Sequence, residues 1–235
     1  MTMTAVAPWI GTLRERPLHA ALKRWCARPD DAIEVAVDGF VIDIVRGDLL
    51  IEVQTRSLSS ARHKIATLLE RGHRVRIVLP VLVDAWIVRV GEDGALLGRR
   101  MSPRHGHPSD AFAELVSIAP LLAHPRLEID LVLVEVEEHR RHAPDGPWRR
   151  RGWAVIERRL VSVIGTVPIR GVGDLAMLLP PGLPERFTTG ELATRLGRST
   201  RIAQQMAYCL RLAEVVVPVG RRGRGVDYRR VAGGS

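Results

Sequence analysis

The order of apolar segments between residues 12 and 90 constrains the fold of this chain more than any other feature of its sequence. Three short apolar runs, at 33–37, 40–45 and 49–55, are separated only by Asp38-Gly39 and by Arg46-Gly47-Asp48. Both separators are typical of tight hairpin turns. The runs therefore predict a three-stranded antiparallel meander.

Helical patterns stand on both sides of this meander. Pro17 suits the first turn of a helix, and apolar residues follow it at helical spacing until Pro29. The same spacing recurs over 57–71 and ends at Gly72, which predicts a second helix. Strands are expected next at 75–83 and 86–90. The order helix, three strands, helix, strand places the chain in the α/β class.

The pattern after residue 90 predicts a polar loop, a helix, a strand and a linker. The expected ranges are 91–108 for the loop, 111–122 for the helix, 127–136 for the strand, 139–151 for a basic, turn-rich linker and 153–164 for a connecting strand. We place the domain boundary at the linker. The predicted division is a first domain at 1–138, a linker and connecting strand at 139–164, and a smaller domain at 165–235.

The charge distribution separates the two predicted domains. Residues 1–138 carry 17 basic against 19 acidic side chains, whereas residues 139–235 carry 18 against 7. A strongly basic segment favours a nucleic-acid partner. Only Lys23 and Lys64 among the 35 basic residues are lysines. A compact ammonium differs chemically from a planar guanidinium, which makes these two positions candidates for a particular role.

The sequence excludes several classes of protein. An apolar content of 46% argues against disorder, and Cys26 and Cys209 have no spacing typical of a disulfide framework or a zinc site. No apolar run reaches the roughly 18 residues of a membrane span, and the first residues lack the basic segment of a signal peptide. We therefore expect a soluble, cytoplasmic protein that does not contact membranes.

Acidic residues in the predicted meander form a candidate metal site. Asp43 lies in the second strand, and Glu52-Val53-Gln54 lies in the third. Because side chains alternate along a strand, Glu52 and Gln54 share one face, and the hairpin brings Asp43 beside them. Two carboxylates among apolar residues repel each other unless a cation separates them. Mg²⁺ binds one or two carboxylates together with waters and phosphate oxygens. The alternative is a pair of acids exposed at a sheet edge.

Asp43 and Glu52-x-Gln54, within this order of helices and strands, resemble the PD-(D/E)XK superfamily, the restriction-endonuclease-like nucleases, over residues 12–90. The resemblance implies a mixed central sheet flanked by helices, and phosphodiester hydrolysis with Mg²⁺, or Mn²⁺ in its place, held by Asp43 and Glu52. It also implies a contribution from an acid on the first helix, where Glu15 is the matching residue.

The chain departs from the family pattern in two places. Gln54 stands where the family usually has Lys, and Val41-Ile42 precedes Asp43 in place of a Pro-Asp pair. A neutral amide orients a water but supplies no positive charge. Lys64, on the second predicted helix, is the candidate for that charge, and its alternative is an ordinary solvated helix charge.

The basic half resembles a winged helix-turn-helix domain. Helices are expected at 188–196 and 200–212 around Gly197-Arg198-Ser199, followed by strands at 215–219 and 226–230. The resemblance implies DNA contacts from the second helix and from the wing tip. The candidate residues are Arg201, Gln204 and Gln205 on the helix, and Arg221, Arg222 and Arg224 on the wing. The alternatives are a protein-interaction module and a small helical packing domain.

Two functional hypotheses follow. The first is a Mg²⁺-dependent nuclease that a winged helix delivers to DNA. The second is a DNA-binding regulator or accessory protein in which the nuclease fold is an inactive scaffold. The Arg-Gly wing keeps RNA open as a substrate. Many nucleases of this fold dimerise, so a homodimer is open by analogy.

Overall fold

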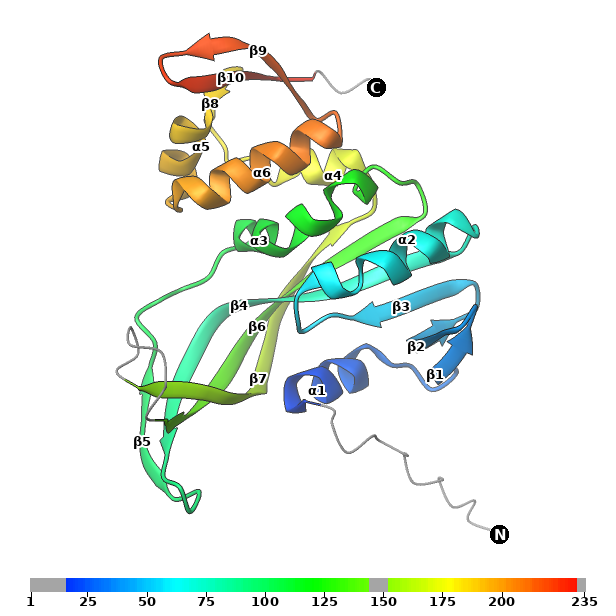
Figure 1. Ribbon diagram of the computed structural model, residues 1–235, viewed down its shortest axis with the longest axis vertical. Helices are drawn as coiled ribbons and strands as arrows, with labels where there is room; N and C mark the ends of the chain where they lie inside the picture. The colour runs from blue at the N-terminus through cyan, green and yellow to red at the C-terminus, as the bar shows by residue number, and fades with distance from the viewer. Residues whose placement is uncertain (1–15, 144–151, 232–235) are drawn as a thin grey trace.

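The computed structural model describes residues 16–143 and 152–231 and has a mixed α/β architecture (Figure 1). A seven-stranded sheet has the order β1-β2-β3-β4-β6-β7, with β5 paired to β4, and a separate three-stranded sheet has the order β8-β10-β9. The helices are α1 (Pro17–Cys26), α2 (Arg62–Glu70), α3 (Phe112–Leu115), α4 (Val172–Met177), α5 (Thr189–Leu196) and α6 (Thr200–Leu212), with 3-10 segments η1 (Leu58–Ser60), η2 (Pro108–Ala111) and η3 (Val116–Leu121). The strands are β1 (Ala32–Val37), β2 (Phe40–Arg46), β3 (Leu49–Val53), β4 (Arg74–Val90), β5 (Leu96–Met101), β6 (Leu127–His142), β7 (Trp153–Ile169), β8 (Arg186–Thr188), β9 (Val216–Arg222) and β10 (Gly225–Arg230).

The predicted meander is confirmed. β1 pairs antiparallel with β2, and β2 pairs antiparallel with β3. Asp38 and Gly39 have φ values of 51° and 84°, the left-handed conformations that a two-residue hairpin turn requires. β3 then pairs parallel with β4, so all five residues of β3 are buried in the middle of the sheet.

Helices cover both faces of the large sheet. Leu18 and Leu22 of α1 pack against Ile44 and Ile51 on one face. The other face is covered by α2, α3 and the 3-10 segments, whose apolar side chains belong to a second buried cluster. Both clusters meet β3, which places the strand with Glu52 at the centre of the molecule.

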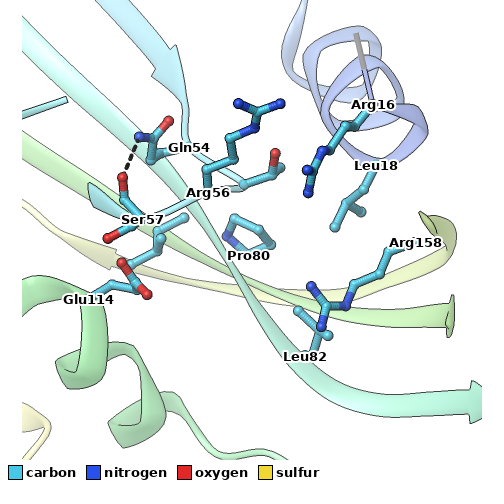
Figure 2. A pocket seen from close by; sticks show the side chains of 11 residues that line it. Arg16, Leu18, Gln54, Arg56, Ser57, Pro80, Leu82, Glu114 and Arg158 are labelled. Atoms are coloured by element: carbon cyan, nitrogen blue, oxygen red, sulfur yellow. Dashed lines mark hydrogen bonds between the residues drawn. The ribbon is translucent and has the colours of Figure 1, made fainter. Parts of the chain in front are cut away.

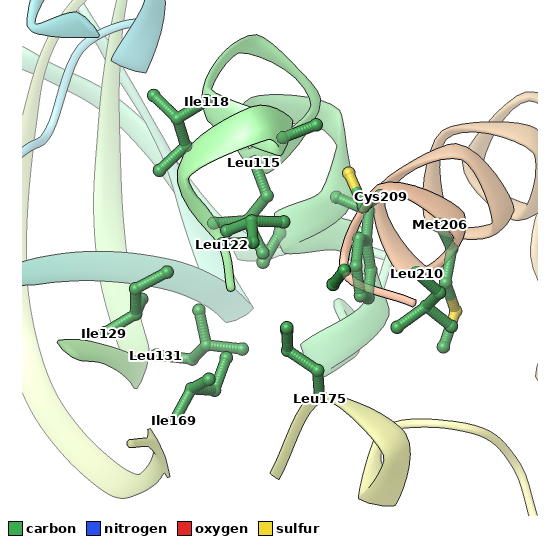
Figure 3. Close-up of a cluster of buried hydrophobic side chains, with 14 of the residues drawn as sticks. Leu115, Ile118, Leu122, Ile129, Leu131, Ile169, Leu175, Met206, Cys209 and Leu210 are labelled. Atoms are coloured by element: carbon green, nitrogen blue, oxygen red, sulfur yellow. The ribbon is translucent and has the colours of Figure 1, made fainter. Parts of the chain in front are cut away.

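The C-terminal unit shares its core with the large sheet. Leu115 and Ile118, from the α3–η3 segment, belong to the same buried cluster as Met206 and Leu210 of α6 (Figure 3). Leu175 of α4 joins this cluster from the segment that follows β7. Apolar burial therefore fixes α6 against the first half of the chain.

Three expectations about the segments after residue 90 are wrong. β5 occupies part of the expected loop at 91–108. Residues 139–142 belong to β6, and β7 runs through 153–169, so the described part of the expected linker lies in a long antiparallel hairpin of the large sheet. The expected helix at 111–122 is a series of short 3-10 and α turns that contains Pro120. The strand at 153–164 is confirmed and extends further.

No helix in the described ranges is long and apolar enough to cross a membrane. Cys209 is buried in the core and Cys26 is half-buried, and both are free thiols.

Candidate functional site

Asp43 lies where the pairing of β2 with β3 ends. The paired positions run from Arg46 and Leu49 to Ile44 and Ile51. At the next position the Asp43 carboxylate accepts a hydrogen bond of 2.8 Å from the Val53 backbone N–H. His19 of α1 contacts the same carboxylate, with 3.4 Å between His19 Nε2 and Asp43 Oδ2. Asp43 thus satisfies a backbone donor that strand pairing leaves free.

Glu52 lies on the neighbouring strand and is 9% exposed. Burial in central β3 rules out the alternative of an acid at the sheet edge. The Lys64 ammonium of α2 forms an ion pair with Glu52 Oε1 and also donates a hydrogen bond to the Val41 carbonyl of β2. Lys64 is therefore not a freely solvated helix charge, since it connects α2 to both strands of the site.

The two carboxylates have opposite pKa shifts. Burial is the main reason that the pKa of Glu52 rises to about 7; the negative charge of Asp43 adds to this rise, and Lys64 opposes it. Burial also acts to raise the pKa of Asp43, but the hydrogen bonds from His19 and the Val53 N–H outweigh it and hold that pKa below its usual value. The site therefore pairs one firmly ionised carboxylate with one that titrates near neutrality.

The carboxylates reach toward helices on opposite faces of the sheet. Asp43 contacts His19 of α1, and Glu52 contacts Lys64 of α2. Asp43 is nevertheless close to Glu52, because its carboxylate accepts a hydrogen bond from the backbone N–H of Val53, the residue that follows Glu52. Together the four side chains form a row across the end of the β2–β3 pair, in which the two carboxylates lie between His19 and Lys64.

Gln54 connects this row to a cavity of about 480 Å³. Its backbone N–H continues the pairing with β4 by donating to the Val78 carbonyl, and its side-chain amide donates to the Ser57 carbonyl (Figure 2). The cavity opens where β3 stops and β4 runs on. Arg16, Arg56 and Arg158 lie around it with Gln54.

The metal-binding prediction rests on Asp43 and Glu52 alone. Glu15, the expected acid on the first helix, lies outside the described residues. Among the described residues, no group of three or more His, Cys, Asp or Glu side chains is arranged to hold a metal ion.

The predicted recognition residues of the basic half lie in different environments. Arg201 and Gln204 are exposed on α6, whereas Gln205 is half-buried. Thr188 and Glu191 form the capping box that begins α5, and Gly197 ends it in a left-handed conformation with φ 61°.

The three wing arginines also differ. Arg221 and Arg224 are exposed at the β9–β10 turn. Arg222 instead pairs with Glu191 at 2.6 Å and with Asp227 at 3.3 Å. Arg222 therefore holds the wing against α5, and the expectation of a free phosphate contact is weakened at this position.

Sequence reasoning missed several residues of the site. His19 and Lys23 lie four residues apart on α1, and the structure gives these two side chains different partners, Asp43 and Glu34. Arg56 follows Gln54 by two residues, and this proximity in sequence could have indicated it as a residue of the site. Arg158 is distant in sequence and carried no such signal.

Comparisons with known proteins place this fold in a family. Residues 16–170 match the family described as "Domain of unknown function (DUF8091)", a match that runs from the start of α1 to the end of β7. An uncharacterized protein of Treponema pallidum (strain Nichols) is 32% identical over 223 residues, which cover 94% of this chain and 87% of that protein. No solved structure matches the chain. The chain therefore belongs to the DUF8091 family.

Proposed function

We propose that the protein is a metal-dependent, restriction-endonuclease-like nuclease that hydrolyses phosphodiester bonds in DNA. The observation that carries the proposal is the carboxylate pair Asp43 and Glu52 on neighbouring strands, one of them buried, next to Gln54 and an arginine-lined cavity. The order of α1, the meander, α2 and β4 supports the same fold type.

The donor set suits Mg²⁺, with Mn²⁺ as a substitute. Asp43 and Glu52 offer the hard oxygen ligands that these ions prefer, and two carboxylates suffice when waters and phosphate oxygens complete the shell. The pKa of Glu52, raised to about 7, reflects a negative charge that burial disfavours and that a cation would stabilise. Bound there, the ion would supply Lewis-acid polarisation of a phosphate and a water of lowered pKa.

The chain's own groups then have distinct roles. Gln54 would orient the attacking water through its amide, and the Lys64 ammonium, already beside Glu52, would offset charge that develops on the phosphate. The exposed residues of α6 and the wing would contact the flanking nucleic acid in the manner of a winged helix.

A second function is favoured by a specific observation. Lys64 already occupies Glu52 as an ion-pair partner, and among the described residues no group of three or more His, Cys, Asp or Glu side chains is arranged to hold a metal ion. Both facts suit a DNA-binding regulator or accessory protein whose nuclease-like fold is a catalytically inactive scaffold.

Cleavage assays separate the two functions. The purified protein is incubated with Mg²⁺ or Mn²⁺ and labelled single-stranded, duplex and branched DNA, with single-stranded RNA as a further substrate. We expect cleavage that EDTA stops and that Glu52→Ala and Asp43→Asn abolish. Glu70→Gln, at an exposed position of α2, is the matched control and should cleave normally. A protein that binds DNA but cleaves none of these substrates supports the scaffold instead.

A further inference from the structure

Two arginines line the Gln54 cavity without an ion pair among the described residues, and Glu114 is a carboxylate on the same lining, where it accepts a hydrogen bond from the Leu58 N–H. Figure 2 shows Arg16, at the start of α1, and Arg158, on β7, extending toward the space beside Pro80, while the Arg56 side chain, from the segment after β3, lines the same cavity and extends away from Pro80. In the described ranges, the side chains of Arg16 and Arg56 make no ion pair or hydrogen bond. Positive groups that converge on a concave surface without a protein partner indicate an anionic ligand.

A second cavity, of about 730 Å³, adjoins the first. Leu82 and Arg158 line both cavities, so the two cavities lie on either side of these residues, and we call them together the arginine groove. Its far wall comes from the segment 102–106 and from the turn between α5 and α6, where Arg198 donates a hydrogen bond to the His105 carbonyl. The shared core fixes these walls relative to each other.

The charge along the arginine groove is positive but partly balanced. Arg140 and Arg158 share the buried carboxylate of Glu138, at 2.6 Å and 3.1 Å. Arg198 lies 3.4 Å from Asp110. Arg104, like the pair beside Gln54, makes no ion pair or side-chain hydrogen bond within the described residues. The unbalanced cations thus occur in both cavities, which suits an anion with charges spaced along its length rather than a single small ion.

The size and lining of the groove favour one strand over a duplex. Cavities of roughly 300–1,000 Å³ hold drug-sized ligands, so each section has room for about one or two nucleotides and not for the cross-section of a double helix. Among residues 16–143 and 152–231, no Phe, Tyr or Trp side chain lines either cavity, so these residues provide no platform for base stacking. The groove is therefore expected to contact the phosphates, which are the same in every nucleotide sequence.

We propose that the arginine groove binds a single nucleic-acid strand by its phosphates, independently of base sequence, and leads it past Gln54. The role of the groove in leading a strand past Gln54 rests on the nuclease function proposed above, but the binding itself can be measured without cleavage. The groove reaches Ile202 at the start of α6, but the α6 and wing residues to which nucleic-acid contacts were first assigned do not line it.

The test measures binding in EDTA, where no cleavage occurs. Fluorescence anisotropy follows labelled single-stranded DNA, single-stranded RNA and duplex DNA of one mixed sequence over a range of salt concentrations. The double variant Arg16→Gln/Arg56→Gln removes the two unpaired cations. Arg24→Gln is the matched control, since Arg24 is also an exposed arginine of α1 but does not line the groove. Circular dichroism verifies that each variant is folded.

We expect single strands to bind more tightly than the duplex and the double variant to lose at least about tenfold in affinity. For single strands, the slope of log K against log salt is about −0.7 per neutralised phosphate, so the loss of two contacts should reduce the slope by about 1.4. Arg24→Gln should retain single-strand affinity. The DNA and RNA probes show which strand is preferred.

Three results would overturn the proposal. They are duplex binding at least as tight as single-strand binding, an equal loss in Arg24→Gln, and an unchanged affinity in the double variant. The outcome is independent of the proposed activity. A groove that binds strands in EDTA while no substrate is cleaved with Mg²⁺ leaves this inference standing and removes the nuclease. If the double variant still cleaves and keeps full single-strand affinity, this inference fails and the proposed nuclease function stands.

Discussion

Replacing Glu52 by Gln should change how stability depends on pH in the absence of metal. The pKa of Glu52 is about 7 in the folded protein, against 4.5 as its ordinary value. Because the folded-state pKa is raised, the folded protein binds the extra proton, and this contribution to stability is complete below about pH 4.5 and lost as pH rises through 7. A glutamine does not titrate, so the variant lacks this dependence.

The magnitude follows from the shift. Each pKa unit corresponds to about 1.4 kcal/mol, so the free energy of unfolding of the wild type should fall by about 3 kcal/mol between pH 4.5 and 8. The difference between Glu52→Gln and wild type should grow by that amount over the same range. For a chain of this length, 3 kcal/mol corresponds to roughly 6–12 °C in melting temperature.

Urea unfolding in EDTA at pH 4.5, 6 and 8 measures the effect, with Glu70→Gln as the matched control. Taking the difference between variant and wild type at each pH cancels the titration of other groups. Adding Mg²⁺ at pH 8 should restore stability to the wild type, by about 2.7 kcal/mol at a hundredfold excess over Kd, and not to Glu52→Gln. If the difference in free energy of unfolding between variant and wild type is constant with pH, the assignment of a raised pKa to the buried Glu52 carboxylate is refuted.

Three further predictions concern the fold. Leu210→Ala should lower the free energy of unfolding by about 2–5 kcal/mol, because the side chain is fully buried; fluorescence of the tryptophans in the sheet and far-UV circular dichroism should still report one transition, and two transitions would argue against a shared core. Thr188→Ala should cost about 1 kcal/mol in urea unfolding through loss of the α5 cap, whereas Thr200→Ala, just beyond the cap of α6, should cost less. Arg222→Gln should lower the melting temperature slightly, by at most about 1 kcal/mol of stability since Arg222 is half-exposed, and Arg221→Gln should leave it unchanged; equal effects would contradict the different roles of these two arginines.

Local features of the fold were predictable from local sequence. Asp38-Gly39 specifies its turn because both positions need positive φ, and Thr188 with Glu191 specifies a helix start through reciprocal hydrogen bonds. Such signals involve residues no more than three apart. They fixed the positions of the meander and of α5 without knowledge of the rest of the chain.

The long hairpin of β6 and β7 could not be predicted in this way. Residues 139–142 are His and Arg only, which is typical of a solvated linker. They are strand because Arg140 and, across the hairpin, Arg158 both pair with the buried Glu138. That stabilisation depends on a partner 20 residues away, and no local pattern contains it.

The candidate site lies between these two cases. The hairpin placed Asp43 beside β3, where it accepts a hydrogen bond from the Val53 N–H, but Gln54 lies beyond the end of β3, and Asp43 and Glu52 contact helices on opposite faces of the sheet. Sequence could nominate Lys64 but not its partner, since the ion pair with Glu52 depends on how α2 crosses the strands. The arginines of the groove were hidden by composition, because 33 arginines leave each one unremarkable.

The shared core changes what the basic half can do. A winged helix on a flexible tether could deliver a nuclease to many positions along DNA. Leu115, Met206 and Leu210 instead belong to one buried cluster, so α6 has a fixed position relative to β3. On its opposite side, α6 exposes Arg201 and Gln204. A nucleic acid held by that exposed face and by the arginine groove at once would meet Gln54 at a set distance from the contacted bases. If cleavage occurs, its position relative to a bound site should therefore be constant, whereas a tethered module would produce a spread of positions.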